Sequence, residues 1–148
     1  MQRVVKKSST RAPAWEKSTL LAVCPNQDDL SSLRDILEAD QWTVRQAHTC
    51  DEAARFMESE TPAVVACENE LPDGSWRDLF KLATSLVDPP PVVVVSRHAD
   101  ENLWAEVLNL GGYDVLAKPF ERNEVSRVMQ MASRHGRIKL SAVMSNTD

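Results

Sequence analysis

The stretch VVACENELPDGSW, residues 64–76, contains the side chain with the clearest potential for chemistry, Glu68. Its pattern is typical of a buried strand followed by a tight loop. The acid at the end of this strand is Glu68. Ser96 and Lys118 also close short apolar runs, so a carboxylate, a hydroxyl and an ammonium group end three predicted strands. The sequence therefore raises the question of what these three groups do if the fold brings them together.

Five apolar runs alternate with five segments of helical periodicity along most of the chain. The runs are typical of short strands, and they cover residues 19–24, 42–47, 62–67, 92–96 and 113–117. The helical segments are DDLSSLRDILEAD, TCDEAARFMESE, SWRDLFKLATSLV, ADENLWAEVLNL and ERNEVSRVMQMAS. Buried strands joined by helices predict an α/β fold, a single (βα)5 unit with a doubly wound, five-stranded parallel sheet.

The carboxyl ends of the strands are the expected functional edge of such a sheet. Ligands of open α/β sheets bind beyond these ends, at the point where the strand order reverses. The candidate site residues at these ends are Cys24, Pro25, Glu68, Ser96 and Lys118.

The length of 148 residues suits one domain with short tails. We expect a mobile tail over residues 1–18, the domain over 19–135 and a second tail over 136–148, where periodicity is lost after Gly136. A further DNA-binding domain is not expected, because only about 13 residues follow the last predicted helix.

The bulk composition excludes several classes of protein. A net charge of −5 gives no electrostatic case for direct binding to nucleic acid. No apolar run approaches the roughly 20 residues of a membrane-spanning helix, and the basic N-terminus lacks the apolar centre of a secretory signal. We therefore expect a cytoplasmic protein without membrane contact. Three cysteines without metal-ligand spacing argue against a disulfide scaffold and a zinc site.

The order of these features resembles the receiver domain of two-component response regulators. The resemblance covers roughly residues 18–135 and rests on ELPDGSW after the third strand, on Ser96, and on YDVLAKPF with its Lys118–Pro119 pair. It implies a flavodoxin-like fold and a role in signal transduction. In that family an aspartate four residues before the loop proline accepts a phosphoryl group, and two acids ending the first strand bind the Mg²⁺ that the transfer needs.

This sequence departs from the family at the acceptor and at the metal ligands. Four residues before Pro72 stands Glu68, whose side chain is one methylene longer than aspartate. Cys24 and Pro25 stand where the acidic pair is expected, and neither suits Mg²⁺, which prefers oxygen ligands. Phosphoryl transfer depends on positioning and charge neutralisation, and both are weakened here. We therefore expect no Mg²⁺ cofactor and no phosphorylation of Glu68.

Three further positions of the family pattern can be compared with this sequence. Ser96 and Lys118 match the family residues that contact the phosphoryl oxygens, and the aromatic switch position of the fifth strand falls on Val115. The resemblance implies that Glu68 and Lys118 lie close together. Two interpretations remain open: the pair fixes the domain in an activated-like state, or the two charges neutralise each other in a vestigial pocket.

Several acids and thiols have a structural and a functional interpretation. Asp28 and Asp29 are either a displaced acidic pair or, as we favour, charges that complement a helix N-terminus. Asp73 belongs to the loop turn rather than acting as a substitute acceptor. Cys24 and Cys67 end neighbouring strands in the receiver order, so a thiol–thiol contact competes with the interpretation of two small buried hydrophobes.

A possible partner surface lies toward the end of the chain. The resemblance implies that the fourth helix, fifth strand and fifth helix form a face for a protein partner or a second copy. Trp104 and Leu108, four residues apart, either belong to this face or widen the core stripe, and Arg122 and Arg127 suit its rim.

We interpret the chain as a stand-alone atypical receiver that signals through protein contacts, without aspartyl phosphorylation. The alternative is a phosphorylation-dependent receiver in a phosphorelay, which uses Glu68 or displaced acids. An independent enzyme is not expected, because no nucleophile–base pair, metal cluster or glycine-rich phosphate loop is present in the sequence.

Overall fold

The computed structural model describes residues 19–146, and it describes side-chain surroundings up to residue 135. The expected N-terminal tail, residues 1–18, and the last two residues lie outside this range. Within it, none of the helices combines the length and the apolar character needed to cross a membrane.

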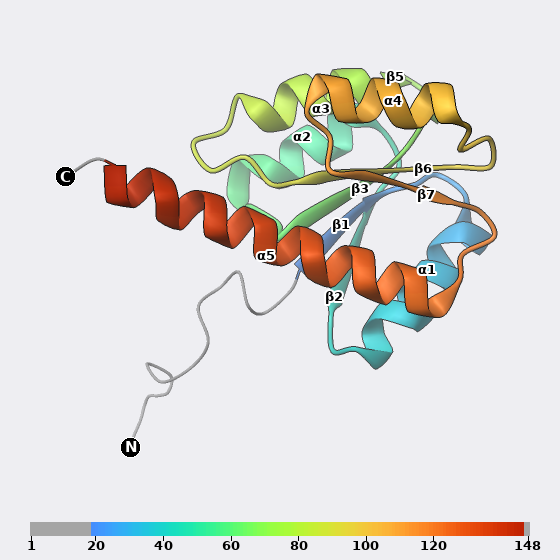
Figure 1. Ribbon diagram of the computed structural model, residues 1–148. Coiled ribbons are helices and arrows are strands. Elements are labelled where there is room, and N and C mark those ends of the chain that lie inside the picture. Colours follow the sequence, from blue (N-terminus) through green and yellow to red (C-terminus); the bar gives the residue numbers. More distant parts are fainter. Residues whose placement is uncertain (1–18, 147–148) are drawn as a thin grey trace.

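Five parallel strands form the sheet at the centre of the fold (Figure 1), in the order β2-β1-β3-β6-β7. They are β1 (Thr19–Val23), β2 (Thr43–Ala47), β3 (Val64–Glu68), β6 (Val92–Ser96) and β7 (Asp114–Ala117). This is the flavodoxin-like order of a doubly wound sheet, with a switch point between β1 and β3. The predicted fold class is therefore confirmed.

Helices cover both faces of the sheet (Figure 1). One face carries α2 (Cys50–Ser59), α3 (Trp76–Thr84) and α4 (Glu101–Leu110), and the other carries α1 (Gln27–Ala39) and α5 (Arg122–Asn146). The core accordingly divides into two clusters of buried residues, one on each side of the sheet. The central strands are buried on both faces, which explains why they are continuous apolar runs.

Short polar side chains begin the helices. The side chains of four residues accept hydrogen bonds from backbone N–H groups in the first turn of the helix that follows: Asn26, Thr49, Ser75 and Asp100. Gly111 ends α4 with φ at 109°, a left-handed conformation that favours glycine. A Cβ atom there would also lie 2.9 Å from Phe80 Cζ.

Two features differ from the predictions. The loop after β3 contains a small antiparallel hairpin of β4 (Glu70–Leu71) and β5 (Gly74–Ser75), which we did not expect. The expected loss of helical structure after Gly136 is wrong, because α5 continues to Asn146. A single glycine costs a helix only about 1 kcal/mol, and good helix formers such as Lys139 and Leu140 follow it. The domain boundary at residue 135 stays a prediction.

Candidate functional site

The ammonium group of Lys118 lies between two carboxylates at the carboxyl edge of the sheet. Its Nζ donates to Asp29 Oδ2 at 2.6 Å and to both oxygens of Glu68, Oε1 at 2.8 Å and Oε2 at 2.7 Å. The three side chains are largely shielded from water, with exposed fractions of 5% for Lys118, 14% for Asp29 and 20% for Glu68. Charge-assisted hydrogen bonds of this kind are stronger than those between neutral groups, so the ammonium group ties α1, β3 and the end of β7 together.

Glu68 is positioned by the centre of the sheet. It is the last residue of β3 and lies opposite Val95 of β6 in the strand register. The next residue, Asn69, donates its backbone N–H to Val95 O at 3.1 Å, so the backbone on both sides of the carboxylate is held by β6. The site therefore stands at the end of a central strand of the sheet.

Asp29 reaches the site from the first turn of α1. The side chain of Asn26 accepts a hydrogen bond from Asp29 N at 2.9 Å, which fixes Asp29 as the third residue of the helix. Helical side chains lean toward the N-terminus of their helix, here toward the end of β1. Asp28 is exposed instead. Our preferred interpretation of both acids as helix-terminal charges is therefore incomplete for Asp29, and the direction of helical side chains is the signal that was missed.

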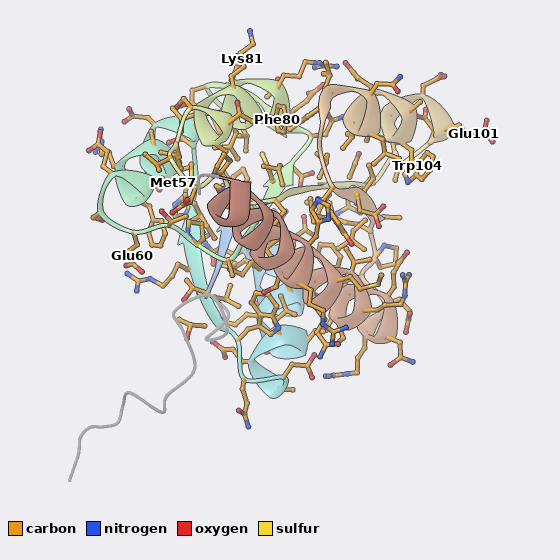
Figure 2. The ribbon with its side chains drawn as sticks, turned by 60° about the vertical axis from the view of Figure 1, so that its left-hand side comes forward. Met57, Glu60, Phe80, Lys81, Glu101 and Trp104 are labelled. Atoms are coloured by element: carbon orange, nitrogen blue, oxygen red, sulfur yellow. The ribbon has the colours of Figure 1, made fainter. Side chains whose placement is uncertain are left out.

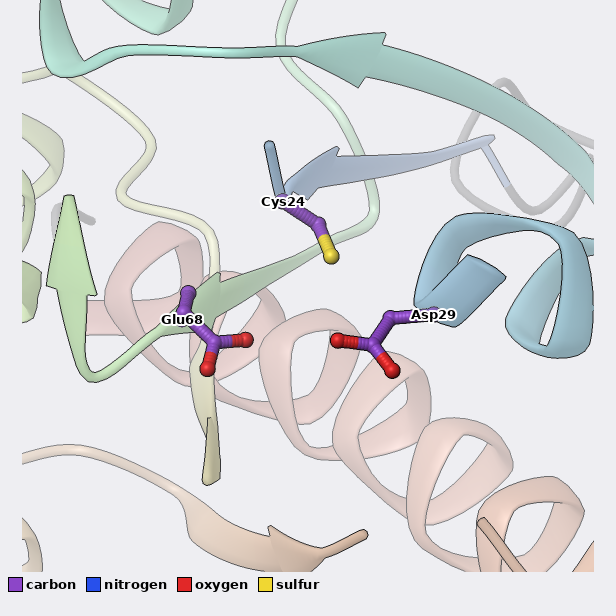
Figure 3. Close-up of side chains that lie close together, drawn as sticks. All are labelled: Cys24, Asp29 and Glu68. Atoms are coloured by element: carbon purple, nitrogen blue, oxygen red, sulfur yellow. The ribbon is translucent and has the colours of Figure 1, made fainter. Parts of the chain in front are cut away.

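Cys24 completes the group of side chains that converge here. Figure 3 shows its sulfur directed into the space between the carboxylates of Glu68 and Asp29. One ligand atom from each of the three side chains lies within 4.8 Å of the other two. The backbone of Cys24 is held by β2, since its N–H donates to Ala47 O and its carbonyl accepts from Gln46 Nε2, both at 3.0 Å.

The surroundings shift the protonation of Lys118 and Cys24. Burial by itself would lower the pKa of Lys118, but the hydrogen bonds and charges of Asp29 and Glu68 outweigh it and raise the pKa above 10.5. Burial, and then the charge of Glu68, raises the pKa of the Cys24 thiol from 9.0 to about 11. At neutral pH the site therefore holds an ammonium group and a neutral thiol.

The remaining sequence-predicted site residues lie nearby without joining the ion pairs. The buried hydroxyl of Ser96 accepts a hydrogen bond from His98 N at 3.0 Å, so it is engaged in the β6–α4 loop. Val115, at the expected switch position, is buried in the core on the α4 side of the sheet. Pro25 is half-buried after β1, and Pro119 is exposed after a cis peptide bond to Lys118.

The loop after Glu68 is attached to α2 through Asp73. The carboxylate of Asp73 accepts hydrogen bonds from Cys50 N at 2.9 Å and Asp51 N at 3.1 Å, the first two residues of α2. These bonds lower the pKa of Asp73 below 3.8. Its expected place in the loop turn was right, but the second role, as a cap of a distant helix, was not predicted.

The structure does not bring Cys24 and Cys67 together as a pair. The sheet register places Cys67 opposite Val23, and both belong to the core on the α2–α4 side. Successive side chains of a strand point to opposite faces, so Cys24 points away from Cys67. The thiol–thiol contact, the less favoured interpretation, is therefore not formed, and both residues are buried as the favoured interpretation of two small hydrophobes predicts. All three cysteines are free.

The sequence model of the response regulator receiver domain matches residues 23–130. The chain belongs to this family. It is thus a receiver domain of two-component signalling, and the predicted resemblance is confirmed.

Two curated proteins that are similar to this chain are transcriptional regulators. The DNA-binding transcriptional regulator NtrC of Proteus hauseri is 26% identical over 114 residues, which cover 74% of this chain and 24% of that protein. The transcriptional regulatory protein FixJ of Rhizobium meliloti is 24% identical over 104 residues, covering 70% of this chain and 51% of that protein. The chain thus spans between about a quarter and a half of these relatives.

Solved structures of receivers share the fold. The signal receiver domain of a putative Luxo repressor protein from Vibrio parahaemolyticus has a TM-score of 0.78 at 17% identity and covers 85% of this chain and 97% of its own. A putative response regulator from Chloroflexus aurantiacus has a TM-score of 0.74 at 24% identity, with coverage of 79% and 98%.

The donor set of this receiver does not fit the family's Mg²⁺ ion. Mg²⁺ demands near-octahedral oxygen coordination at about 2.1 Å. Here the position of one strand-end acid offers the thiol of Cys24 and the next offers Pro25, which has no side-chain donor. The two available carboxylates, Asp29 and Glu68, are already hydrogen-bonded to Lys118. No step of a reaction through Mg²⁺ follows from this arrangement.

The candidate partner surface lies beside β7, an edge strand of the sheet. Trp104 on α4 is 50% exposed, outside the core (Figure 2), and its indole Nε1 donates to Asp114 Oδ1 at 3.4 Å. Leu108 is half-buried, and Arg122 and Arg127 on α5 are exposed. Trp104 therefore covers the start of an edge strand while leaving half of its large apolar surface accessible.

Proposed function

We propose that this receiver signals through protein contacts without phosphorylation of Glu68. The observation that carries the proposal is the position of the Lys118 ammonium group, which holds both oxygens of Glu68 and one oxygen of Asp29. The charge that a phosphoryl group would bring to this site in other receivers is replaced here by carboxylates of the chain itself.

Three properties of the site oppose phosphoryl transfer together. An attacking carboxylate oxygen must be electron-rich and aligned with the phosphorus atom, but both Glu68 oxygens are turned toward the ammonium group of Lys118 and accept hydrogen bonds from it, which lowers their nucleophilicity. The incoming phosphate is anionic and would meet a second carboxylate, Asp29. The donor set does not suit Mg²⁺, so the charge neutralisation on which phosphoryl transfer depends is missing.

The proposal makes the domain a cytoplasmic binding module rather than an enzyme, without a Mg²⁺ cofactor and without direct contact to nucleic acid. Its output depends on a protein partner or a second copy that binds the face formed by α4, β7 and α5. The half-exposed Trp104 supports this choice of surface, because aromatic side chains of this kind dominate many interfaces.

A phosphodonor experiment tests the central claim. The full chain is incubated with acetyl phosphate and Mg²⁺, and its intact mass is measured. We expect no stable gain of about 80 Da, the mass of one phosphoryl group. A gain that is lost in Glu68→Gln and retained in Glu70→Gln, a matched change at an exposed neighbouring acid, would overturn the proposal.

The second candidate is a phosphorylation-dependent receiver that uses unorthodox acids. One observation favours it: Asp29 is a displaced acid that does reach the site, 2.6 Å from Lys118. If Asp29 is the acceptor, Asp29→Asn abolishes the mass gain. If the gain is retained in Asp29→Asn, peptide mapping of the modified chain shows whether Glu68 carries the phosphoryl group.

Variants also decide between the two interpretations of the Glu68–Lys118 pair. If the pair fixes an activated-like state, Glu68→Gln and Lys118→Ala weaken partner binding while the circular dichroism spectrum stays unchanged. If the pair is vestigial, both folded variants bind the partner with the affinity of the wild-type domain.

A further inference from the structure

A pocket opens at the amino edge of the sheet, opposite to the edge that carries Lys118. Its lining includes Val92, the first residue of β6, and Tyr113, which directly precedes β7. The volume of the pocket is about 420 Å³. Pockets that hold small molecules in proteins measure roughly 300–1,000 Å³, so this one has the size of a ligand site.

Aromatic rings form part of the wall of this pocket. They belong to Phe80 of α3 (Figure 2), to Tyr113 and to His135 of α5, and the ring centroids of Tyr113 and His135 are 5.3 Å apart. A run of three prolines, residues 89–91, adds further apolar surface. The face of a phenyl or phenol ring carries partial negative charge, which attracts an organic cation.

Two helices end at the pocket. Thr84 is the last residue of α3, Gly111 is the C-cap of α4, and both line the pocket. The C-terminal end of a helix carries about half a negative elementary charge. The last turn of α4 has no basic side chain, and Lys81 in the last turn of α3 does not line the pocket.

Within the described part of the chain, the lining of the pocket contains no lysine or arginine. The two helix ends therefore meet no permanent positive charge from the lining, and their negative potential extends into a pocket with aromatic walls. These surroundings favour a positively charged ligand over a neutral or an anionic one.

We propose that this pocket binds a small organic cation of the alkylammonium or quaternary ammonium class. The helix ends and the ring faces stabilise its charge, and the rings and prolines cover its apolar substituents. The pocket shares no residue with the pair of Glu68 and Lys118. The inference goes beyond the proposed function, and each can fail without the other.

Choline and its uncharged isostere 3,3-dimethyl-1-butanol test the inference, because the two compounds have nearly the same shape and differ in charge. The full-length chain, labelled with nitrogen-15, is titrated with each compound at constant ionic strength, and its amide resonances are recorded by NMR. We expect choline to shift the amide resonances of Gly111, Gly112 and Tyr113 in a saturable way. The alcohol should bind at least about fivefold more weakly. Equal affinities for the two compounds, or choline shifts that do not saturate, would overturn the inference.

Two variants locate the bound cation. Thr84→Lys brings a positive charge into the lining from an exposed position, so it should weaken choline binding at least about fivefold. Ser85→Lys is the matched control, because it adds the same charge at an exposed neighbour outside the lining, and it should keep the choline affinity within about twofold. Equal choline affinities of these two variants would contradict the inference.

Tyr113→Leu keeps the test decisive even where Thr84→Lys does not fold. Leucine retains apolar surface but removes the ring face, so choline binding should weaken while binding of the alcohol stays unchanged. Unchanged choline binding in both Tyr113→Leu and Thr84→Lys would show that the cation does not lie in this pocket.

Discussion

Both carboxylate oxygens of Glu68 accept hydrogen bonds from the ammonium group of Lys118, at 2.8 Å and 2.7 Å. The two residues are 50 positions apart in the chain; Glu68 ends β3 and Lys118 directly follows β7, and β6 separates these two strands in the sheet. The carboxylate at the expected acceptor position is thus paired through both of its oxygens with the receiver's own lysine.

Lys118→Met is expected to destabilise the domain strongly. It leaves the carboxylates of Asp29 and Glu68 shielded from water and close to each other without a counter-charge. The removal of one partner from a buried ion pair costs about 3 kcal/mol or more. Urea unfolding followed by circular dichroism measures the loss. Lys81→Met, at an exposed position of α3, should change the free energy of unfolding by less than about 0.5 kcal/mol. Equal losses of stability in the two variants would mean that the ion pairs of Lys118 with Asp29 and Glu68 do not stabilise the fold.

Glu68→Asp by itself should not create a phosphorylated receiver. The variant has the family's acceptor but still lacks the strand-end acids and their metal site. The triple variant Glu68→Asp, Cys24→Asp and Pro25→Asp has the family's acceptor and also the two strand-end acids that bind Mg²⁺ in the family. We therefore expect it to gain about 80 Da with acetyl phosphate and Mg²⁺. Intact mass spectrometry compares the single and triple variants. Phosphorylation of the single variant would show that Cys24 and Pro25 do not limit the reaction.

Alkaline pH should weaken the fold. The Cys24 thiol has a pKa raised from 9.0 to about 11, and the pKa of Lys118 is raised above 10.5. A group whose pKa is raised on folding contributes its full stability below the unfolded value and loses it as the pH rises through the folded value. The free energy of unfolding should therefore fall between about pH 9 and pH 11 through Cys24, and further above pH 10.5 through Lys118.

Cys24→Ser provides the control for this pH dependence. Serine does not titrate in this range, so the variant should show a shallower decline between pH 9 and pH 11. Denaturant unfolding at several pH values, with a reducing agent present, measures both slopes. Identical slopes would mean that Cys24 does not contribute.

Trp104→Ala should abolish association while preserving the fold. Half of the indole is exposed, so its truncation costs the fold about 1 kcal/mol. At an interface the same change typically costs 2 kcal/mol or more. Sedimentation velocity over a concentration series measures self-association, and a pull-down with wild-type and variant domains measures binding of a different protein.

Val87→Ala is the matched control for this surface, because Val87 is 97% exposed and lies in the loop after α3. It should leave both kinds of association unchanged. If Trp104→Ala and the wild type behave alike in both assays, the face formed by α4, β7 and α5 does not mediate the output.

Asp73→Ala should destabilise the domain by about 1 kcal/mol, the usual loss for a helix cap. The two N–H groups at the start of α2 lose their acceptor, and the loop after Glu68 loses its attachment to α2. Thermal unfolding measures the loss of stability. The exposed Asp88→Ala serves as control and should not change the melting temperature.

The fold could be predicted from the sequence because the residues that specify each strand and each helix are close together in the chain. Each buried strand is a short apolar run, as in VVVVS of β6, and each helix begins after a short polar cap such as Thr49 or Ser75. The length of α5 was missed, since Gly136 weakens a helix without ending it.

Only the site residues that stand at the ends of predicted strands could be predicted from the sequence. The sequence by itself determined which side chains stand at the strand ends, namely Cys24, Glu68 and Lys118, and its resemblance to the family predicts that Glu68 stands in place of the acceptor aspartate and Cys24 and Pro25 in place of the metal ligands. The tertiary structure alone decided that Asp29, 89 positions before Lys118, turns its carboxylate toward the same ammonium group. Spacing along the chain does not report which side chains converge across strands and helices, because that depends on sheet order, helix entry and side-chain direction.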